Sequence, residues 1–298
     1  MVVGMKKILF IFNPKSGKAQ MKNYLIDILD IFIKQQYEVT VHPTQSPLDA
    51  LNIVKEKSAQ YDMLVCSGGD GTLAEVVEGI IKAKKHIPIG YIPSGSTNDF
   101  AASLGIPKNM KQAAEIITRE KRFSCDVGKF NENIFVYIAA FGIFTDVSYE
   151  TNQGMKNILG HMAYILEGMK RLSAIKSYHL NIKYDTEELE GDFLFGMITN
   201  SLSVGGFKTI TGKDVQFDDG VFEVTLIKKP NSPIEINKLM SALVLGDVDG
   251  ECMHCFKTSY IEFSSQEEIA WTLDGEFGGE VKQAYVKNMQ KAVEIIVP

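Results

Sequence analysis

Three short segments rich in Gly, Ser and Asp each follow a predicted strand and precede a predicted helix. They are residues 13–18 (Asn-Pro-Lys-Ser-Gly-Lys), 68–72 (Gly-Gly-Asp-Gly-Thr) and 93–99 (Pro-Ser-Gly-Ser-Thr-Asn-Asp). Glycine lets the backbone approach a phosphate closely, and the helix that follows offers N–H groups at the positive end of its dipole. An Asp in such a loop can hold the Mg²⁺ that offsets phosphate charge. The segments therefore predict a phosphate site that uses a divalent cation.

A single loop of this kind is more typical of an ordinary strand-to-helix turn, in which Ser, Thr or Asp caps the helix. Ligands of open α/β sheets bind at the carboxyl ends of the strands, so three such loops at one sheet edge favour a shared ligand. The sequence contains neither GxxxxGK[ST] nor GxGxxG, which excludes the two standard nucleotide loops.

Two carboxylates, Asp274 and Glu276, flank a glycine late in the chain, between two predicted strands. Transfer of a phosphoryl group to an alcohol needs a group that accepts the hydroxyl proton, and Glu276 can supply it. Asp274 in the same turn can orient that base or share its role. The alternative is an ordinary Asp-Gly hairpin over residues 273–277.

Strands and helices are predicted to alternate along the first 127 residues. We expect strands at 7–12, 38–42, 63–66, 87–92 and 123–127, and helices at 19–36, 47–58, 72–84, 97–104 and 111–120. This alternation implies βαβ crossovers and a parallel sheet covered on both faces. The sequence thus predicts an α/β nucleotide-binding domain over residues 1–127.

From residue 128 onward, strands dominate. We expect them at 134–144, 178–184, 192–200, 221–228, 259–264, 269–273, 281–287 and 292–297, with helices near 155–175 and 233–244. Many strands with few crossover helices predict an antiparallel, sandwich-like or barrel-like second domain over residues 128–298. The boundary has no flexible-linker composition, so close coupling of the two domains is expected.

The composition bounds the class of function. The chain of 298 residues carries 31 Lys and Arg against 37 Asp and Glu, a net charge of −6. This charge excludes the basic footprint of a nucleic-acid-binding protein and gives no strong attraction to an anionic membrane. No stretch approaches the roughly 18 apolar residues that span a membrane, so a cytoplasmic protein is expected.

The four cysteines predict reduced thiols rather than a disulfide scaffold. Cys252 and Cys255 have metal-like spacing, but no second Cys/His pair completes a zinc site. The oligomeric state stays open, a homodimer included.

The order of the motifs resembles that of diacylglycerol kinase catalytic domains. Asn-Pro-x-Ser-Gly at 13–17, Gly-Gly-Asp-Gly-Thr at 68–72, Gly-Ser-x-Asn-Asp at 95–99 and Asp-Gly-Glu at 274–276 occur in the same order. Length and layout are similar to the soluble bacterial lipid kinases of that family. Because the second motif is shared with NAD kinases and phosphofructokinase-like folds, the resemblance implies such a fold for the first domain.

The resemblance also implies a nucleotide and a base. The expected general base is Glu276, the third residue of Asp-Gly-Glu. The expected ATP contacts are Asn13, Pro14, Lys15, Ser16, Gly17, Thr44, Gly69, Asp70, Gly71, Thr72, Leu73, Ala74, Glu75 and Ser96.

Two metal sites are implied in the same way. Asp70, Asp99 and Asp126 match acidic positions that organise catalytic Mg²⁺, partly through water. A structural Mg²⁺, which some relatives bind, is expected at Gln216, Asp219 and Val221, with the carboxylate of Asp219 and the carbonyl oxygens of Gln216 and Val221 as ligands.

The resulting expectation is an ATP- and Mg²⁺-dependent kinase that phosphorylates the hydroxyl of diacylglycerol or a related lipid alcohol. The first domain would hold ATP, the second would hold the lipid and the base, the reaction would occur between them, and contact with the membrane would be peripheral and transient. A Met-rich apolar face at 155–172 suits an acyl chain but is more often core. The alternatives are an NAD kinase-like enzyme and a catalytically silent nucleotide or lipid sensor; a sensor would be expected to lack Asp70 or Glu276.

Overall fold

A computed structural model describes residues 5–143, 176–202, 214–232, 234–239 and 252–298. The chain divides into two compact units, one formed by 1–127 with 291–298 and the other by 128–290. The sequence places residues 291–298 in the second domain, but they belong to the first unit. The reason is the last strand, whose end pairs in parallel with the first unit's sheet at Ile295 and Ile89.

The first unit is built on a parallel sheet. Its strands are β1 (Lys6–Phe12), β2 (Tyr37–Pro43), β3 (Met63–Gly68) and β4 (Ile89–Pro93), in the order β4-β3-β1-β2. The registers of all three pairs run parallel. β3 and β4 are buried along their whole length, as expected for strands covered on both faces.

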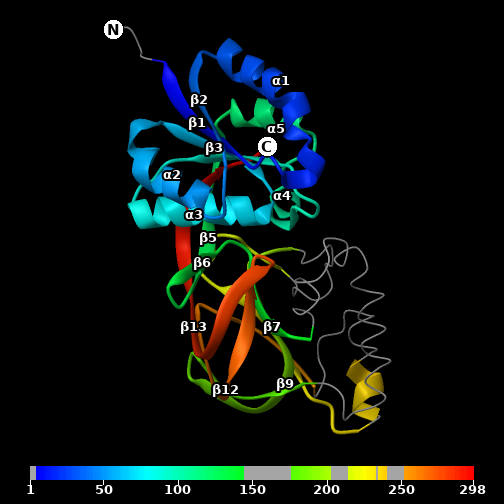
Figure 1. The fold of residues 1–298 in the computed structure, drawn as a ribbon. Coiled ribbons are helices and arrows are strands. Elements are labelled where there is room, and N and C mark those ends of the chain that lie inside the picture. The colour runs from blue at the N-terminus through cyan, green and yellow to red at the C-terminus, as the bar shows by residue number, and fades with distance from the viewer. Residues whose placement is uncertain (1–4, 144–175, 203–213, 233, 240–251) are drawn as a thin grey trace. The chain divides into compact units, whose positions relative to one another are not determined.

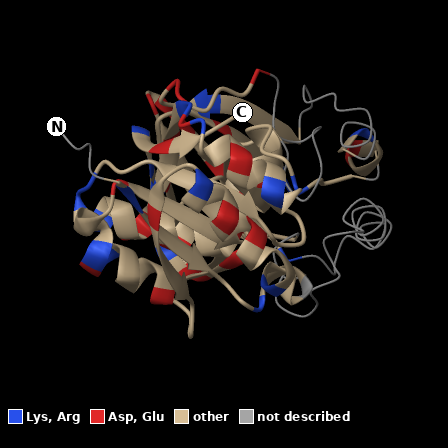
Figure 2. Ribbon diagram, turned by 90° about the horizontal axis from the view of Figure 1, so that it is seen from above, with Lys and Arg blue, Asp and Glu red and all other residues tan. Residues whose placement is uncertain are grey.

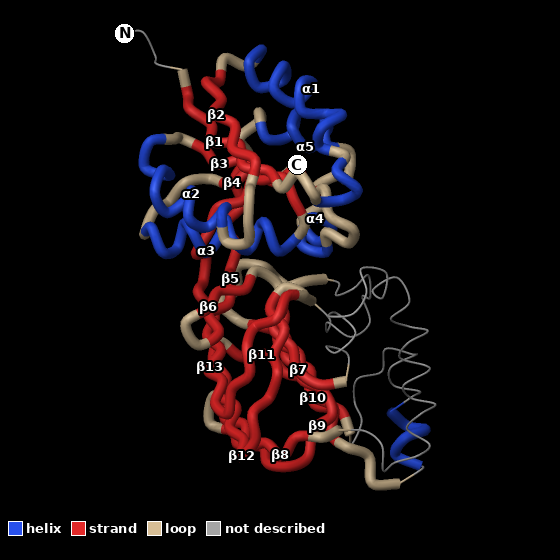
Figure 3. The backbone as a smooth tube through the Cα atoms, viewed as in Figure 1, coloured by secondary structure: helices blue, strands red, loops and turns tan. Residues whose placement is uncertain are grey.

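Helices cover this sheet (Figure 1, Figure 3). They are η1 (Ser16–Ala19), α1 (Met21–Lys34), α2 (Asp49–Lys57), η2 (Ser58–Gln60), α3 (Asp70–Ala83), α4 (Asp99–Ser103) and α5 (Met110–Ile117). α1 packs against α5, and α2 packs against α3 on the opposite face. Acidic and basic residues alternate along the ribbon (Figure 2), and Lys82 and Glu78 of α3 form an i,i+4 ion pair.

The second unit is antiparallel. Its strands are β6 (Asn133–Phe135), β7 (Ile138–Gly142), β8 (Tyr178–Tyr184), β9 (Glu187–Thr199), β10 (Phe222–Lys228), β11 (Met253–Thr258) and β12 (Tyr260–Leu273), together with the end of β5 (Arg122–Phe130) and most of β13 (Glu276–Ile296). β9 and β12 are long, and each pairs with both β7 and β8, so these four strands close into a ring.

Several predicted elements differ from the structure. The strands expected at 259–264 and 269–273 form one strand, β12, whose register shifts between Ser264 and Ile269. Those expected at 281–287 and 292–297 are likewise one strand, β13. β11 was not predicted, since its mixed sequence Met-His-Cys-Phe-Lys-Thr has no clear alternation. The helix expected at 155–175 lies outside the described residues, and of the one near 233–244 only 234–239 are described, as helix.

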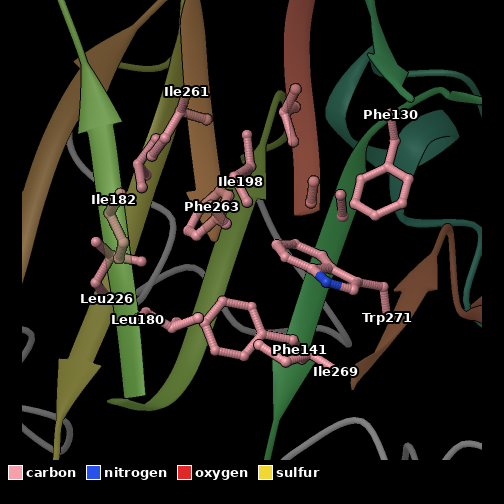
Figure 4. Packing of buried hydrophobic residues seen from close by; sticks show 14 of the residues in the cluster. Phe130, Phe141, Leu180, Ile182, Ile198, Leu226, Ile261, Phe263, Ile269 and Trp271 are labelled. Carbon is pink, nitrogen blue, oxygen red and sulfur yellow. The ribbon is translucent and has the colours of Figure 1, made fainter. Parts of the chain in front are cut away.

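Aromatic rings fill the core of the second unit (Figure 4). The ring centroid of Trp271 lies 4.9 Å from that of Phe130, 4.8 Å from that of Phe141 and 5.1 Å from that of Phe263. Such tilted and edge-on pairs stabilise a core beyond their buried area. Because Trp271 is close to the end of β12, this packing fixes the hairpin that carries Asp274 and Glu276.

Candidate functional site

The three Gly-rich loops of the first unit meet at one edge of its sheet. The N–H of Asn13 donates to the carbonyl of Ser67 at 2.9 Å, which joins the first loop to the end of β3. The N–H of Ser94 donates to the carbonyl of Gly68 at 2.8 Å, which joins the second and third loops. Parallel pairing of β1, β3 and β4 brings these strand ends together. The structure thus assembles the three predicted segments.

Glycine is required where these loops touch. A Cβ atom on Gly17 would lie 1.7 Å from the carbonyl oxygen of Ser94, and one on Gly95 would lie 2.6 Å from the Cα of Gly69. No side chain fits at such distances, so at Gly17 and Gly95 the loops contact one another through backbone. We call these closely packed, Gly-rich loops the cradle, because glycine backbone of this kind permits the close approach of phosphate oxygens.

Asp70 is the first residue of α3, directly after Gly69, and is 8% exposed. The fourteen residues of α3 make its start a favourable place for negative phosphate charge. A carboxylate at this position suits Mg²⁺, which proteins bind through one or two carboxylates together with substrate phosphates. Asp70 and the cradle therefore fit a metal–nucleotide complex.

Tyr91 of β4 contacts the second and third loops, a role that the sequence does not predict. Its hydroxyl donates to the carbonyl of Gly68 at 3.2 Å and lies 3.4 Å from Oδ1 of Asn98. Burial, followed by the charge of Asp70, holds the pKa of Tyr91 well above its usual range. In the sequence Tyr91 lies within a predicted apolar strand, so its type and position indicate only a buried core residue.

Asn98 shapes the third loop. Its Oδ1 accepts the N–H of Gly95 at 2.9 Å, and its Nδ2 donates to the carbonyl of Gly95 at 2.8 Å. Asn98 adopts the left-handed region at φ 55°, which asparagine tolerates better than most residues. This turn leaves Ser96 exposed and places Asp99, 3% exposed, at the first position of α4.

Glu75, an expected ATP contact, binds the start of a neighbouring helix. Its carboxylate accepts the N–H of Leu48 at 3.0 Å and the N–H of Ala50 at 3.1 Å. α2 has no side-chain cap of its own and begins after Leu48, which has φ 64°, so Glu75 caps it from α3. Burial raises the pKa of Glu75, while these N–H groups oppose the rise. Thr44 lies nearby in sequence, and its N–H donates to the carbonyl of Phe12 at 2.9 Å.

Asp126 is fully buried in β5. Its Oδ1 accepts the N–H of Lys291 at 2.7 Å, which ties β5 to the part of β13 that returns to the first unit. Asp126 thus has a structural contact in addition to the metal role expected for it.

Asp274 and Glu276 lie on a two-residue hairpin. Leu273 pairs with Glu276, and the loop residues Asp274 and Gly275 have φ values of 52° and 85°, as a type I′ turn requires. The Asp274 carboxylate is buried, and it accepts N–H groups of Val136, Tyr137 and Ile138 at 2.7, 2.9 and 3.1 Å. Burial raises its pKa to about 6, against the lowering effect of these bonds. Glu276 by contrast is exposed.

The loop before β10 holds the residues expected to bind a structural cation. Oδ1 of Asp219 accepts the N–H of Val221 at 3.2 Å, and Gln290 Nε2 donates to the carbonyl of Asp218 at 3.2 Å. The ammonium of Lys257 lies 3.8 Å from Oδ2 of Asp219. Within the described ranges, no group of three or more His, Cys, Asp or Glu side chains could hold a metal ion.

Among the residues that the structure describes, no helix combines the length and the apolar character that a bilayer span requires.

Comparisons with known proteins cover both units. The profile of the diacylglycerol kinase catalytic domain matches residues 7–130, and that of the YegS C-terminal NAD kinase beta sandwich-like domain matches residues 138–297. A crystal structure of a diacylglycerol kinase from Bacillus anthracis str. Sterne has a TM-score of 0.77 at 22% identity, covering 98% of this chain and 97% of that one. Another structure from that strain has a TM-score of 0.83 at 24% identity, with the same coverage. These structures share the fold.

Curated relatives extend the match over the whole length. A protein of Bacillus subtilis (strain 168) named diacylglycerol kinase is 31% identical over 296 residues, 99% of this chain and 97% of the relative. One of Staphylococcus carnosus (strain TM300) with the same name is 32% identical over 296 residues, 98% and 95% of the two chains. With both profiles and these full-length relatives in agreement, the chain belongs to the diacylglycerol kinase family.

Proposed function

We propose that this protein transfers the γ-phosphoryl group of ATP to the hydroxyl of diacylglycerol or a closely related lipid alcohol. The observation that carries the proposal is the backbone cradle of Gly17, Gly69 and Gly95 with Asp70 at the start of α3. A backbone cradle beside a buried carboxylate is what phosphoryl transfer needs, because positioning and charge neutralisation provide most of the catalysis. Family membership then supplies the class of acceptor.

The first unit is proposed to hold ATP through its loops and α3, over the positions expected from the sequence. Asp70 would hold Mg²⁺, with Asp99 and Asp126 as further carboxylates that act partly through water. When bound, Mg²⁺ would offset the negative charge that develops on the transferred group. Within this unit, Tyr91 and Asn98 keep the loops in place by their contacts with Gly68 and Gly95.

The second unit is proposed to supply the base. Glu276 is exposed on a rigid hairpin, so its carboxylate can approach a substrate hydroxyl and accept its proton. Asp274 is better suited to positioning than to proton transfer, because its carboxylate oxygens accept three backbone N–H groups. In this proposal Asp274 anchors the hairpin to residues 136–138, and Glu276 performs the chemistry.

The test is a phosphate-transfer assay with a panel of acceptors. Diacylglycerol, a sphingoid base, a polyprenol and NAD are offered separately in detergent micelles with Mg²⁺ and ATP, and each phosphorylated product is identified by mass spectrometry. We expect transfer to diacylglycerol or to another lipid alcohol of the panel, and none to NAD. Transfer to NAD alone would instead support the NAD kinase-like alternative, and nucleotide binding without transfer to any acceptor would support a silent sensor.

A further inference from the structure

Lys257 lies among oxygen atoms at the place where a structural Mg²⁺ is expected. β10 and β11 pair in a register that sets Glu223 directly opposite Lys257. The Lys257 ammonium donates to the main-chain oxygen of Asp214 at 2.8 Å and lies 3.0 Å from Oε1 of Glu223. Oδ2 of Asp219 is 3.8 Å away. Oxygens from the loop and from β10 therefore face one ammonium group.

The buried carboxylate of Glu223 needs a positive charge beside it, which the Lys257 ammonium provides. The side chain of Glu223 is only 4% exposed, and a buried carboxylate is strongly destabilising unless a cation accompanies it. Lys257 is 37% exposed, so its stem covers the pair while the ammonium reaches inward. The register of β10 and β11 therefore places the positive charge of Lys257 beside Glu223, and no bound ion is needed there.

The expected metal ligands do not fit a divalent cation while Lys257 holds this position. Of the two oxygens of Asp219, Oδ1 accepts the N–H of Val221, and Oδ2 faces the ammonium. A divalent cation on the Asp219 carboxylate would lie close to the ammonium, and like charges about 4 Å apart repel strongly in a partly buried site.

We propose that Lys257 takes the place of the structural cation: its ammonium, rather than a divalent metal, joins residues 214–221 to β10 and β11. The proposal concerns the second unit alone and does not depend on the identity of the acceptor or on catalysis. It predicts that the stability of the second unit does not depend on a divalent metal at this loop.

The first experiment uses the full-length wild-type protein. Elemental analysis is followed by thermal unfolding in EDTA and in millimolar Mg²⁺ or Ca²⁺, without nucleotide. We expect substoichiometric metal and melting temperatures that agree within about 1 °C, because an ion that does not bind the folded state adds no stability. Stoichiometric bound metal, with a melting temperature several degrees lower in EDTA, would overturn the proposal.

The second experiment removes the ammonium. Lys257→Met keeps most of the stem and should lower the melting temperature by about 5 °C or more, since it leaves a buried carboxylate unpaired. The matched control is Lys183→Met, which removes a lysine that is 60% exposed and lies 3.5 Å from Glu188; it should change the melting temperature by less than about 2 °C.

The double variant Lys257→Met with Glu223→Gln should recover part of the loss, because it removes both charges. Equal stability of Lys257→Met and Lys183→Met would contradict the proposal. Should Lys257→Met fail to fold, the wild-type measurement in EDTA still decides between the ammonium and a metal.

Discussion

At the scale of single residues, the proposed phosphate site depends on backbone contact as much as on charged side chains. Gly17 and Gly95 are the positions where a Cβ would collide with another loop. The sequence predicts these loops because Gly, Ser and Asp cluster after strands, but it does not predict their mutual contacts. The supporting roles of Tyr91 and Asn98 depend on neighbours that are adjacent only after folding.

Asp70→Asn tests the metal role at this scale. The change is nearly isosteric and the cradle is backbone, so ATP affinity should change by less than about tenfold, or roughly 1.4 kcal/mol. We expect a severe loss of kcat and a raised Mg²⁺ requirement, because the charge that holds Mg²⁺ is gone. Isothermal titration with ATP, beside a rate series in Mg²⁺, measures both effects.

The matched control is Glu78→Gln on the same helix, which removes a carboxylate paired with Lys82 and should leave kcat unchanged. Normal turnover of Asp70→Asn at low Mg²⁺ would move the metal assignment to Asp99 or Asp126.

At the scale of elements, hydrophobic patterns predict most strands and helices, and the misses have physical causes. β12 and β13 are longer than their apolar segments because each strand runs on through a polar stretch, in β12 with a register shift between Ser264 and Ile269. β11 is missed because its mixed sequence gives no period of two, although pairing with β10 makes it a strand. The Asp-Gly hairpin is predicted from its sequence, but the N–H groups that Asp274 accepts are more than 130 residues away and leave no local signal.

Asp274→Asn should destabilise the second unit by about 2–4 kcal/mol, because an amide in place of the carboxylate disturbs three buried backbone bonds. Urea unfolding at pH 7 measures this. The control is Asp185→Asn in the turn between β8 and β9, where φ is 48° and asparagine is well tolerated. Equal stability of the two variants would show that Asp274 does not anchor its hairpin.

The stability of the wild-type protein should depend on pH through Asp274, whose pKa burial raises from its ordinary 3.8 to about 6. Asp274→Asn lacks this titrating group. Since the folded-state pKa lies above the unfolded-state value, the associated stability is complete below about pH 4 and is lost as the pH rises through about 6. The loss is of the order of 3 kcal/mol. The destabilisation caused by Asp274→Asn should therefore be larger at pH 4 than at pH 7, whereas a constant difference would contradict the raised pKa.

Glu75 provides a second test at the scale of elements. Glu75→Ala leaves the start of α2 without its cap and should cost about 1–2 kcal/mol of unfolding free energy, with partial recovery in Glu75→Gln. Because the cap holds the segment that follows Thr44, the KM for ATP should rise severalfold while kcat changes little. A raised KM with unchanged stability would instead indicate that Glu75 contacts the nucleotide directly.

At the scale of the whole molecule, charge limits how the protein reaches a lipid. Its net charge is −6, and acidic and basic residues alternate along the ribbon (Figure 2). Electrostatic attraction to anionic lipid should therefore be weak. We expect binding to vesicles rich in phosphatidylglycerol, measured by sedimentation, to be no stronger in about 50 mM than in about 300 mM NaCl. Release by salt would reveal a basic docking surface.

Nucleotide binding is proposed for the first unit and proton transfer for the second, and Glu276→Gln separates these two functions most directly. ATP affinity by titration and initial rates of transfer to diacylglycerol are measured on the same preparation, beside Glu280→Gln, a nearby exposed glutamate of β13 opposite Ala270. We expect Glu276→Gln to bind ATP as the wild type does and to lose at least about 10²-fold in kcat, while Glu280→Gln keeps full activity. Turnover of Glu276→Gln within about threefold of the wild type would contradict the proposed role of Glu276.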